Sequence, residues 1–246
     1  MSRGPLVLGD TGHALFRLSR ARATSRSVGF DVKEVLYPGF EGRPCAESFD
    51  AFFESVEDQV EVYRLSHKRP VVVATGLGAL VLLELRARGA VKDLPSIVLG
   101  AVPWRSAAER RPGSRASGEE ERARFADPAF QGEFVQTHLH SPYDASELGA
   151  FFAGYATCDA IGQLHEWFDS GWTESVQGRL AIRPEGIDGI RVWACGADEV
   201  IDEDEHDAAV RALGARWPTE RIEHWGHYPY LDAPGPWIGA LGYAGV

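Results

Sequence analysis

Residues 71–79 have the residue types that place a reactive side chain on a sharp turn between a strand and a helix. Three valines precede the turn, and a run rich in Leu and Ala follows it. The motif G-x-S-x-G needs small residues at its outer positions, because strand and helix nearly touch there, and Ala74 and Gly78 meet this need. The central position carries Gly76, which has no side chain and cannot act as a nucleophile.

Two other interpretations of this segment are weaker. A phosphate-binding loop is disfavoured because neither G-x-x-x-x-G-K-[ST] nor G-x-G-x-x-G occurs here. Thr75 is a poor replacement nucleophile, because it precedes the apex and its side chain is expected to point away from the site. Cys195 ends an apolar run and is expected to be a small buried hydrophobic residue.

Two later segments resemble those of the α/β-hydrolase fold superfamily. Residues 192–201 look like its strand and acid loop, and residues 223–234 resemble the Gly-His loop that carries its catalytic histidine. The order of elbow, acid and histidine is also that of the family. The chain is therefore identified as an atypical member, in which Gly76 replaces the serine nucleophile.

The resemblance implies that His227 is the catalytic histidine and that Asp198 or Glu199 is its acid partner. A carboxylate beside a histidine fixes the tautomer of the imidazole and stabilises the imidazolium. The alternatives are a packed histidine bonded to backbone and a solvated acidic turn. The residues that follow, 202–207, are predicted to form an acidic, solvent-exposed surface.

The resemblance also points to the loop after the first core strand. In the family, one oxyanion donor is the backbone N–H after the nucleophile, here Leu77, and the other comes from this loop, which here contains Asp10 and Thr11. A carboxylate repels a developing negative charge unless it is protonated or paired. Asp10 is thus a candidate substrate anchor or second acid/base, the alternative being that Asp10 or Thr11 caps the next helix. The candidate substrate-binding residues are Thr11, Thr75, Gly76, Leu77, Trp104, Phe152 and Trp172.

Apolar runs bounded by turn residues alternate with helical patterns over most of the chain. This alternation predicts an α/β fold with a doubly wound, mostly parallel sheet. Strands are expected within residues 5–9, 30–37, 70–74, 96–102, 190–195 and 221–225. Helices are expected over residues 13–22, 49–63 with Ser48 as cap, 77–89, around 208–215, and from 236.

One long region interrupts the alternation. Residues 105–183 show no strand pattern and are rich in aromatic residues, so we expect a helical lid inserted into a core formed by residues 1–104 and 184–246. The polar stretch 106–124 at its start is predicted to be a mobile loop. Some of the aromatic side chains are expected to line an apolar site.

Composition narrows the class of protein further. The net charge of −11 disfavours binding to nucleic acid. Three scattered cysteines indicate neither a zinc site nor a disulfide framework and are typical of a cytoplasmic protein. No apolar run is long enough to span a membrane, and no pattern for a metal or another cofactor is found.

Without a nucleophile there is no acyl-enzyme route, but a histidine–carboxylate dyad can still transfer a proton. The superfamily that the chain resembles includes members that do not hydrolyse their substrates. The resemblance therefore implies a non-hydrolytic isomerase or epimerase, lyase or cyclase of a natural-product pathway, and we expect it to act on a small apolar molecule or a peptide. The alternatives are a ligand-binding protein without catalysis, and an esterase or thioesterase that has lost its serine at position 76. The sequence predicts no oligomeric state.

Overall fold

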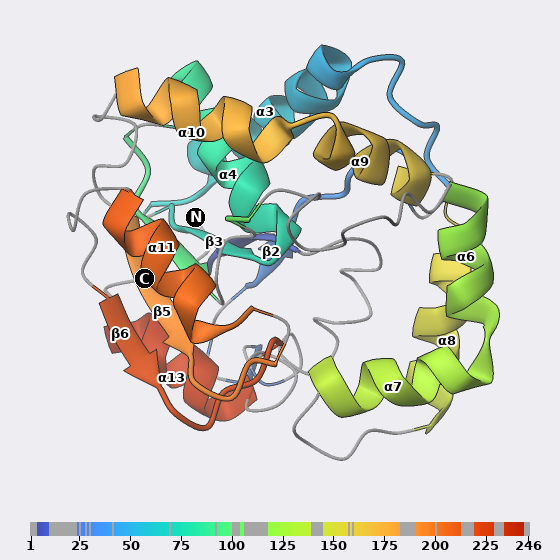
Figure 1. The fold of residues 1–246 in the computed structure, drawn as a ribbon. Helices are drawn as coiled ribbons and strands as arrows, with labels where there is room; N and C mark the ends of the chain where they lie inside the picture. The colour runs from blue at the N-terminus through green and yellow to red at the C-terminus, as the bar shows by residue number, and fades with distance from the viewer. Residues whose placement is uncertain are drawn as a thin grey trace.

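The structure is a computed structural model that describes residues 4–9, 24, 26–27, 29, 31–40, 42–68, 70–91, 93–99, 104–105, 118–138, 145–156, 158, 160–182, 190–199, 201–212, 219–228 and 234–243. Within these residues, six strands form one sheet in the order β2-β1-β3-β4-β5-β6, and every neighbouring pair is parallel (Figure 1). The strands are β1 (Leu6–Leu8), β2 (Lys33–Glu34), β3 (Val72–Thr75), β4 (Ser96–Leu99), β5 (Ile190–Cys195) and β6 (Thr219–Ile222). The predicted doubly wound α/β fold is therefore confirmed.

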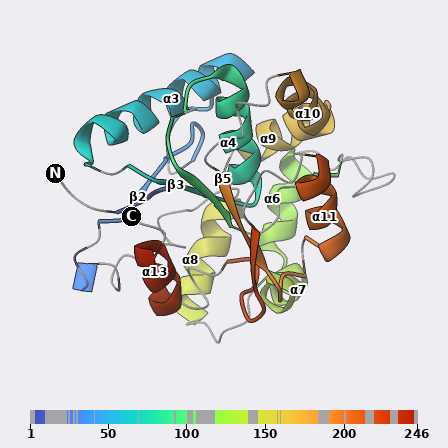
Figure 2. The same ribbon diagram turned by 90° about the vertical axis from the view of Figure 1, so that its left-hand side faces the viewer.

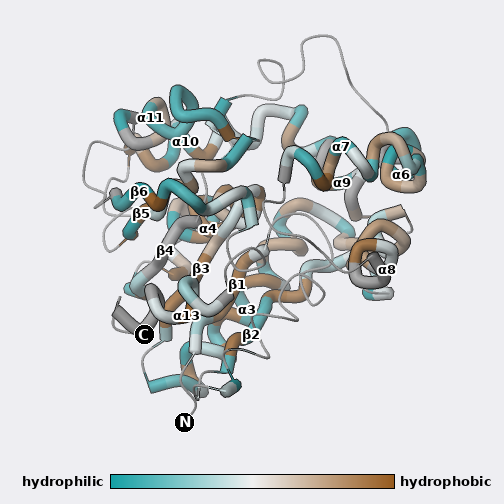
Figure 3. Tube along the Cα trace, turned by 90° about the horizontal axis from the view of Figure 1, so that it is seen from below, coloured by the Kyte–Doolittle hydropathy of each residue, from teal (hydrophilic) through white to brown (hydrophobic). Residues whose placement is uncertain are grey.

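The central strands are apolar because both faces of a parallel sheet are covered by helices. All four residues of β3 are buried, and so are the three residues of β1. Hydrophobic residues accordingly follow the line of β1 and β3 in Figure 3. In the register of the sheet, Val73 pairs with Val7 on one side and with Ile97 on the other. Because the strands are parallel, the C-terminal ends of β3 and β5 lie at the same end of the sheet, where the candidate site lies.

Helices lie on both sides of the sheet, as Figures 2 and 3 show. On one side are α3 (Phe49–Ser66), α4 (Leu77–Arg88) and α11 (Glu203–Ala212), and on the other is α13 (Pro234–Tyr243). The start of α3 is set by Ser48, whose side chain accepts a hydrogen bond from the backbone N–H of Ala51 at 3.1 Å, as predicted from the sequence.

Among the described residues, five helices lie between β4 and β5 in the chain. They are α6 (Gly118–Ala126), α7 (Pro128–His138), α8 (Ala145–Ala156), α9 (Ala160–Asp169) and α10 (Trp172–Ile182). The first three lie together, apart from the sheet, in Figure 1. The prediction of a mobile loop over 106–124 is wrong at its C-terminal end, because residues 118–124 belong to α6. This helix was missed because most of its residues are charged, so its sequence shows no clear helical period of apolar residues.

The last of these helices is joined to the core by an ion network around one buried carboxylate. The Glu84 side chain, on α4, is fully buried and accepts hydrogen bonds from Arg179 of α10 and from Arg88 Nε at 2.7 Å. Arg88 also contacts Asp50 at 2.9 Å and lies over the ring of Phe53. Removing one partner of a buried ion pair is costly, so this network holds α10 against α4.

The bounds of several elements differ from the sequence-based expectations. The helix α11 begins at residue 203 rather than near 208, because Asp202 caps it and acidic residues at 203–205 suit the positive end of the helix dipole. The strand β6 covers 219–222 rather than 221–225, and β2 has only two of the residues expected over 30–37. The helix expected over 13–22 lies outside the described residues.

Gly78 offers a test of the packing between β1 and α4. A Cβ atom at this position would lie 2.1 Å from the Leu8 carbonyl oxygen and 2.5 Å from that of Gly9. We predict that Gly78→Ala lowers the free energy of unfolding by about 3 kcal/mol or more, because backbone atoms must move apart. Urea unfolding measures the change. The control is Gly132→Ala on α7, where a Cβ meets no atom within 4 Å, and where about 0.5–1 kcal/mol of stabilisation is expected. Equal effects of the two substitutions would contradict the prediction.

Candidate active site

The turn between β3 and α4 is formed by one residue, Gly76. Its backbone has φ +53° and ψ −129°, in a region that residues with side chains rarely adopt. The helix starts directly at Leu77, and Ala79 donates a backbone hydrogen bond to the Gly76 carbonyl at 2.9 Å. The segment thus has the strand, sharp turn and helix predicted from its sequence. Its apex bears no side chain.

Thr75 lies at the end of β3 and is fully buried. Its hydroxyl has no hydrogen-bond partner among the described residues. The N-terminus of α4 follows immediately, and its first backbone N–H groups, including that of Leu77, carry partial positive charge.

The acid loop and the histidine loop are joined by backbone hydrogen bonds. Gly196 donates to the Ile222 carbonyl and Ala197 donates to the Trp225 carbonyl, both at 3.0 Å. A Cβ at Gly196 would lie 2.7 Å from the Glu223 Cα, so only glycine lets the two loops approach this closely. This pairing places the residues after β5 beside those after β6.

Asp198 and His227 form a buried pair where these loops meet. His227 Nδ1 lies 2.9 Å from Asp198 Oδ2 and 3.1 Å from Oδ1, and the two side chains are 3% and 2% exposed. Ile201 donates its backbone N–H to Asp198 Oδ1 at 3.2 Å, and the ring of Tyr228 packs edge-on against that of His227. A proton on Nδ1 donated to the carboxylate leaves Nε2 as the ring atom that exchanges a proton with a bound molecule.

The other predicted site residues differ in whether they are described and in what they contact. Glu199 is exposed, so of the two predicted acids Asp198 is the one that contacts the histidine. Asp10 and Thr11 lie outside the described residues. Cys195 ends β5 and is partly buried, and its thiol lies 4.0 Å from the Trp193 carbonyl oxygen.

The three aromatic candidates are all buried. Trp172 packs against Phe49 and Phe53 of α3, with ring centroids 5.5 and 5.7 Å apart. The Trp104 backbone is bound by other side chains on both sides, through its N–H and its carbonyl. These contacts hold the two tryptophans within the protein, and their contact with substrate stays a prediction.

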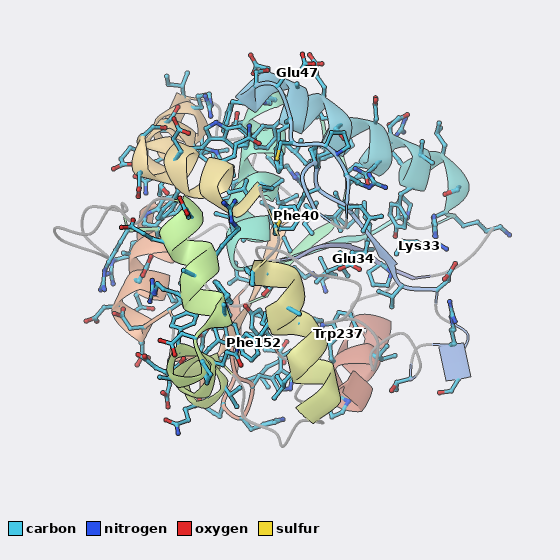
Figure 4. All side chains as sticks on the ribbon, turned by 90° about the vertical axis from the view of Figure 1, so that its right-hand side faces the viewer. Lys33, Glu34, Phe40, Glu47, Phe152 and Trp237 are labelled. Carbon is cyan, nitrogen blue, oxygen red and sulfur yellow. The ribbon has the colours of Figure 1, made fainter. Side chains whose placement is uncertain are left out.

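Phe152 belongs to an aromatic cluster between α6, α7 and α8 (Figure 4). Its ring contacts those of Phe134 and Phe151 at 5.6 and 5.2 Å, and Phe125 stacks on Tyr155 at 4.1 Å. Such ring pairs stabilise the packing beyond the apolar area that they bury. The cluster holds the three helices together, and a contact of Phe152 with substrate likewise stays a prediction.

The prediction of an exposed acidic surface over 202–207 is wrong at two positions. Glu205 is 2% exposed and His206 is 9% exposed. The signal that was missed is the spacing Asp202-x-x-Glu205, which resembles a capping box and marks a helix start. The burial of the Glu205 side chain, however, follows only from its contacts with the backbone of Trp104 and Arg105, which the sequence does not reveal.

The described residues contain no group of His, Cys, Asp and Glu side chains arranged to hold a metal ion. None of the described helices is both long and apolar enough to cross a membrane. The described part of the site therefore offers a histidine–carboxylate pair after β5 and β6, and the N-terminus of α4 after β3, all at the C-terminal ends of the parallel strands.

An α/β sheet with an elbow after β3, an acid after β5 and a histidine after β6 defines the class of protein. Residues 7–240 match the model of the alpha/beta hydrolase family, and the chain belongs to this family. A search of curated protein sequences found no match.

Solved structures with the same fold share little sequence with this chain. An esterase from Exiguobacterium antarcticum is 13% identical with a TM-score of 0.66, over 99% of this chain and 92% of that one. An extracellular alpha/beta-hydrolase from a Paenibacillus species is 14% identical with a TM-score of 0.65, over 98% of both chains. The haloalkane dehalogenase DbeA from Bradyrhizobium elkani is 13% identical with a TM-score of 0.65, over 99% and 92%. At these identities the likeness concerns the fold.

His206, beside the acid loop, makes stability depend on pH. Burial is the main cause that lowers its pKa below the usual 6.5, and nearby Asp207 acts in the opposite direction. The unfolded chain then binds a proton near pH 6.5 and the folded chain only at lower pH, so stability falls as the pH drops below about 6.5. We predict that His206→Gln weakens this fall, as measured by urea unfolding between about pH 7.5 and pH 5. The exposed His224, changed to Gln, is the control, and an unchanged slope in His206→Gln would contradict the prediction.

Proposed function

We propose that Gly76 occupies the nucleophile position of the family and that the protein is a non-hydrolytic enzyme. It would act as an isomerase or epimerase, a lyase or a cyclase, with His227 as the group that accepts or delivers a proton. The observation that carries the proposal is the buried contact between His227 Nδ1 and Asp198 Oδ2 at 2.9 Å, in a parallel sheet whose elbow after β3 bears no side chain at its apex.

An acyl-enzyme needs a nucleophilic atom at the apex of the elbow, and glycine supplies none. Thr75 and Cys195 fit this role poorly, since Thr75 is fully buried and Cys195 lies at the end of β5, which β4 separates from β3 in the sheet. A histidine held by a carboxylate keeps its capacity for general acid–base catalysis without any nucleophile.

The start of α4 can stabilise the negative charge that proton transfer creates in the transition state. Removing a proton next to a carbonyl group creates an enolate, and negative charge develops on its oxygen. Backbone N–H groups at the start of α4, that of Leu77 among them, are the kind of donors that stabilise such charge. In this proposal the elbow retains its electrostatic role and loses only its covalent one.

The enclosed position of His227 limits how a substrate can reach it. The His227 side chain is 3% exposed, so a molecule must be enclosed by protein when it reaches the ring. The inserted helices are rich in aromatic residues, and Phe152 and Trp172 are the residues that we propose to contact an apolar substrate once these helices make room for it. We likewise propose that the region 105–183 acts as a lid over the site, and that the substrate is a small apolar molecule.

Proton transfer is testable without the natural substrate. In D₂O, phenylacetone and ethyl phenylacetate carry C–H bonds next to a carbonyl whose exchange is followed by proton NMR. We predict exchange above the background rate with the native protein and a loss of about 100-fold or more in His227→Ala. Binding of these probes without His227-dependent exchange would instead favour a ligand-binding protein.

The substitution Gly76→Ser tests whether residue 76 occupies the nucleophile position of the family. A serine Oγ there is expected to be activated by His227, so the variant gains hydrolysis of p-nitrophenyl acetate and forms an acyl-enzyme visible by mass spectrometry. The native protein and Gly76→Ala should form none, and Gly76→Ser with His227→Ala should lose the gain. A Gly76→Ser protein that is folded but inert would contradict the assignment of Gly76 to the nucleophile position.

A further inference from the structure

The start of the inserted segment is held by a buried carboxylate of the core. Glu205, on α11, accepts hydrogen bonds at one oxygen from the backbone N–H groups of Trp104 at 2.6 Å and Arg105 at 2.8 Å. Glu205 is 2% exposed. A carboxylate buried this deeply is tolerated only while its donors stay in place, so the two N–H groups and the helix hold each other in position.

Two further contacts make this attachment rigid. The guanidinium of Arg105 binds both carboxylate oxygens of Asp202 at 2.8 and 3.1 Å. Gln177 of α10 donates to the Trp104 carbonyl at 2.9 Å. The Trp104 backbone is thereby bound from both α10 and α11.

The residues that lead into α11 also help to place the acid of the dyad. Asp202 Oδ1 accepts the backbone N–H of Glu205 at 2.8 Å and so fixes the first turn of the helix. One residue earlier, Ile201 donates its N–H to Asp198 Oδ1 at 3.2 Å. Asp198 in turn contacts His227 Nδ1. A displacement of the start of α11 would therefore move one of the donors that set the orientation of the Asp198 carboxylate.

We propose that Glu205 is a positioning residue, which ties the start of the inserted segment to α11 and thereby keeps the Asp198 carboxylate aligned with His227. The inference rests on the proposed function, in which this pair moves the proton. It adds that one side chain both holds the start of the inserted segment and contributes to the geometry of the pair.

The test reads the histidine ring directly. Two-bond ¹H–¹⁵N correlation spectra of the full chain at about pH 9, where histidines are neutral, show which ring nitrogen carries the proton. His227 is identified among the eight histidines by its absence in His227→Ala. We expect the native protein to hold the Nδ1–H tautomer and Glu205→Ala to show a mixture of both. Glu205→Gln should lie between them, because its amide oxygen accepts hydrogen bonds but lacks the charge.

Asp204→Asn is the matched control. It removes the same charge from the neighbouring position of the same helix, where the side chain is exposed, and should leave the His227 nitrogen shifts unchanged. Native shifts in both Glu205 variants would overturn the proposal, as would equal perturbation by Asp204→Asn. If Glu205→Ala does not fold, Glu205→Gln decides by the same criterion.

The measurement uses no substrate, so its outcome is separate from that of the proposed function. A mixed tautomer in the Glu205 variants, together with an absence of proton transfer in the native protein, would keep Glu205 as the positioning residue and reject the proposed function. Proton transfer by the native protein, with native nitrogen shifts in the Glu205 variants, would support the proposed function and reject Glu205 as the positioning residue.

Discussion

A charge buried away from water must be matched by hydrogen-bond donors or by an opposite charge, and three carboxylates of this protein impose that requirement on its fold. Glu84 is matched by arginines of α4 and α10, and Glu205 by two backbone N–H groups at the start of the insertion. Asp198 is matched by His227 and by the N–H of Ile201. Each carboxylate joins segments that are distant in sequence. Together they attach both ends of the insertion and the histidine loop to the core.

The elbow depends on a different constraint, which involves only backbone atoms. Gly76 adopts a positive φ, and Gly78 lies against the carbonyl groups at the end of β1, where no Cβ fits. Neither requirement depends on a nucleophilic atom at the apex. The turn, the start of α4 and the N–H of Leu77 can therefore keep their places without one. In this sense the dyad and a nucleophile at the apex are structurally independent.

The sequence predicted the features that local chemistry determines. The buried strands follow from apolar runs, and the start of α3 follows from Ser48. The acid loop and histidine loop were found through their family resemblance, but the choice between Asp198 and Glu199 needed the paired loops of the structure. Glu205 was misassigned to the surface, because its partners are backbone groups about 100 residues away in a segment without any motif. Long-range backbone partners leave no periodic signal in the chain.

The buried position of the dyad links these constraints to chemistry. A histidine at a water-filled surface exchanges its proton with solvent, whereas His227 is enclosed and can exchange with a bound molecule only when that molecule displaces or joins the protein around it. In the proposed function, the segment that yields is the insertion. Its attachment at Trp104 is made by Glu205, four residues after Ile201, which donates to Asp198. Access to the proposed base and alignment of that base would then be controlled through the same few residues. In the proposed enzyme, which forms no covalent intermediate and whose rate depends on the placement of one proton, this coupling matters more than it would beside a serine.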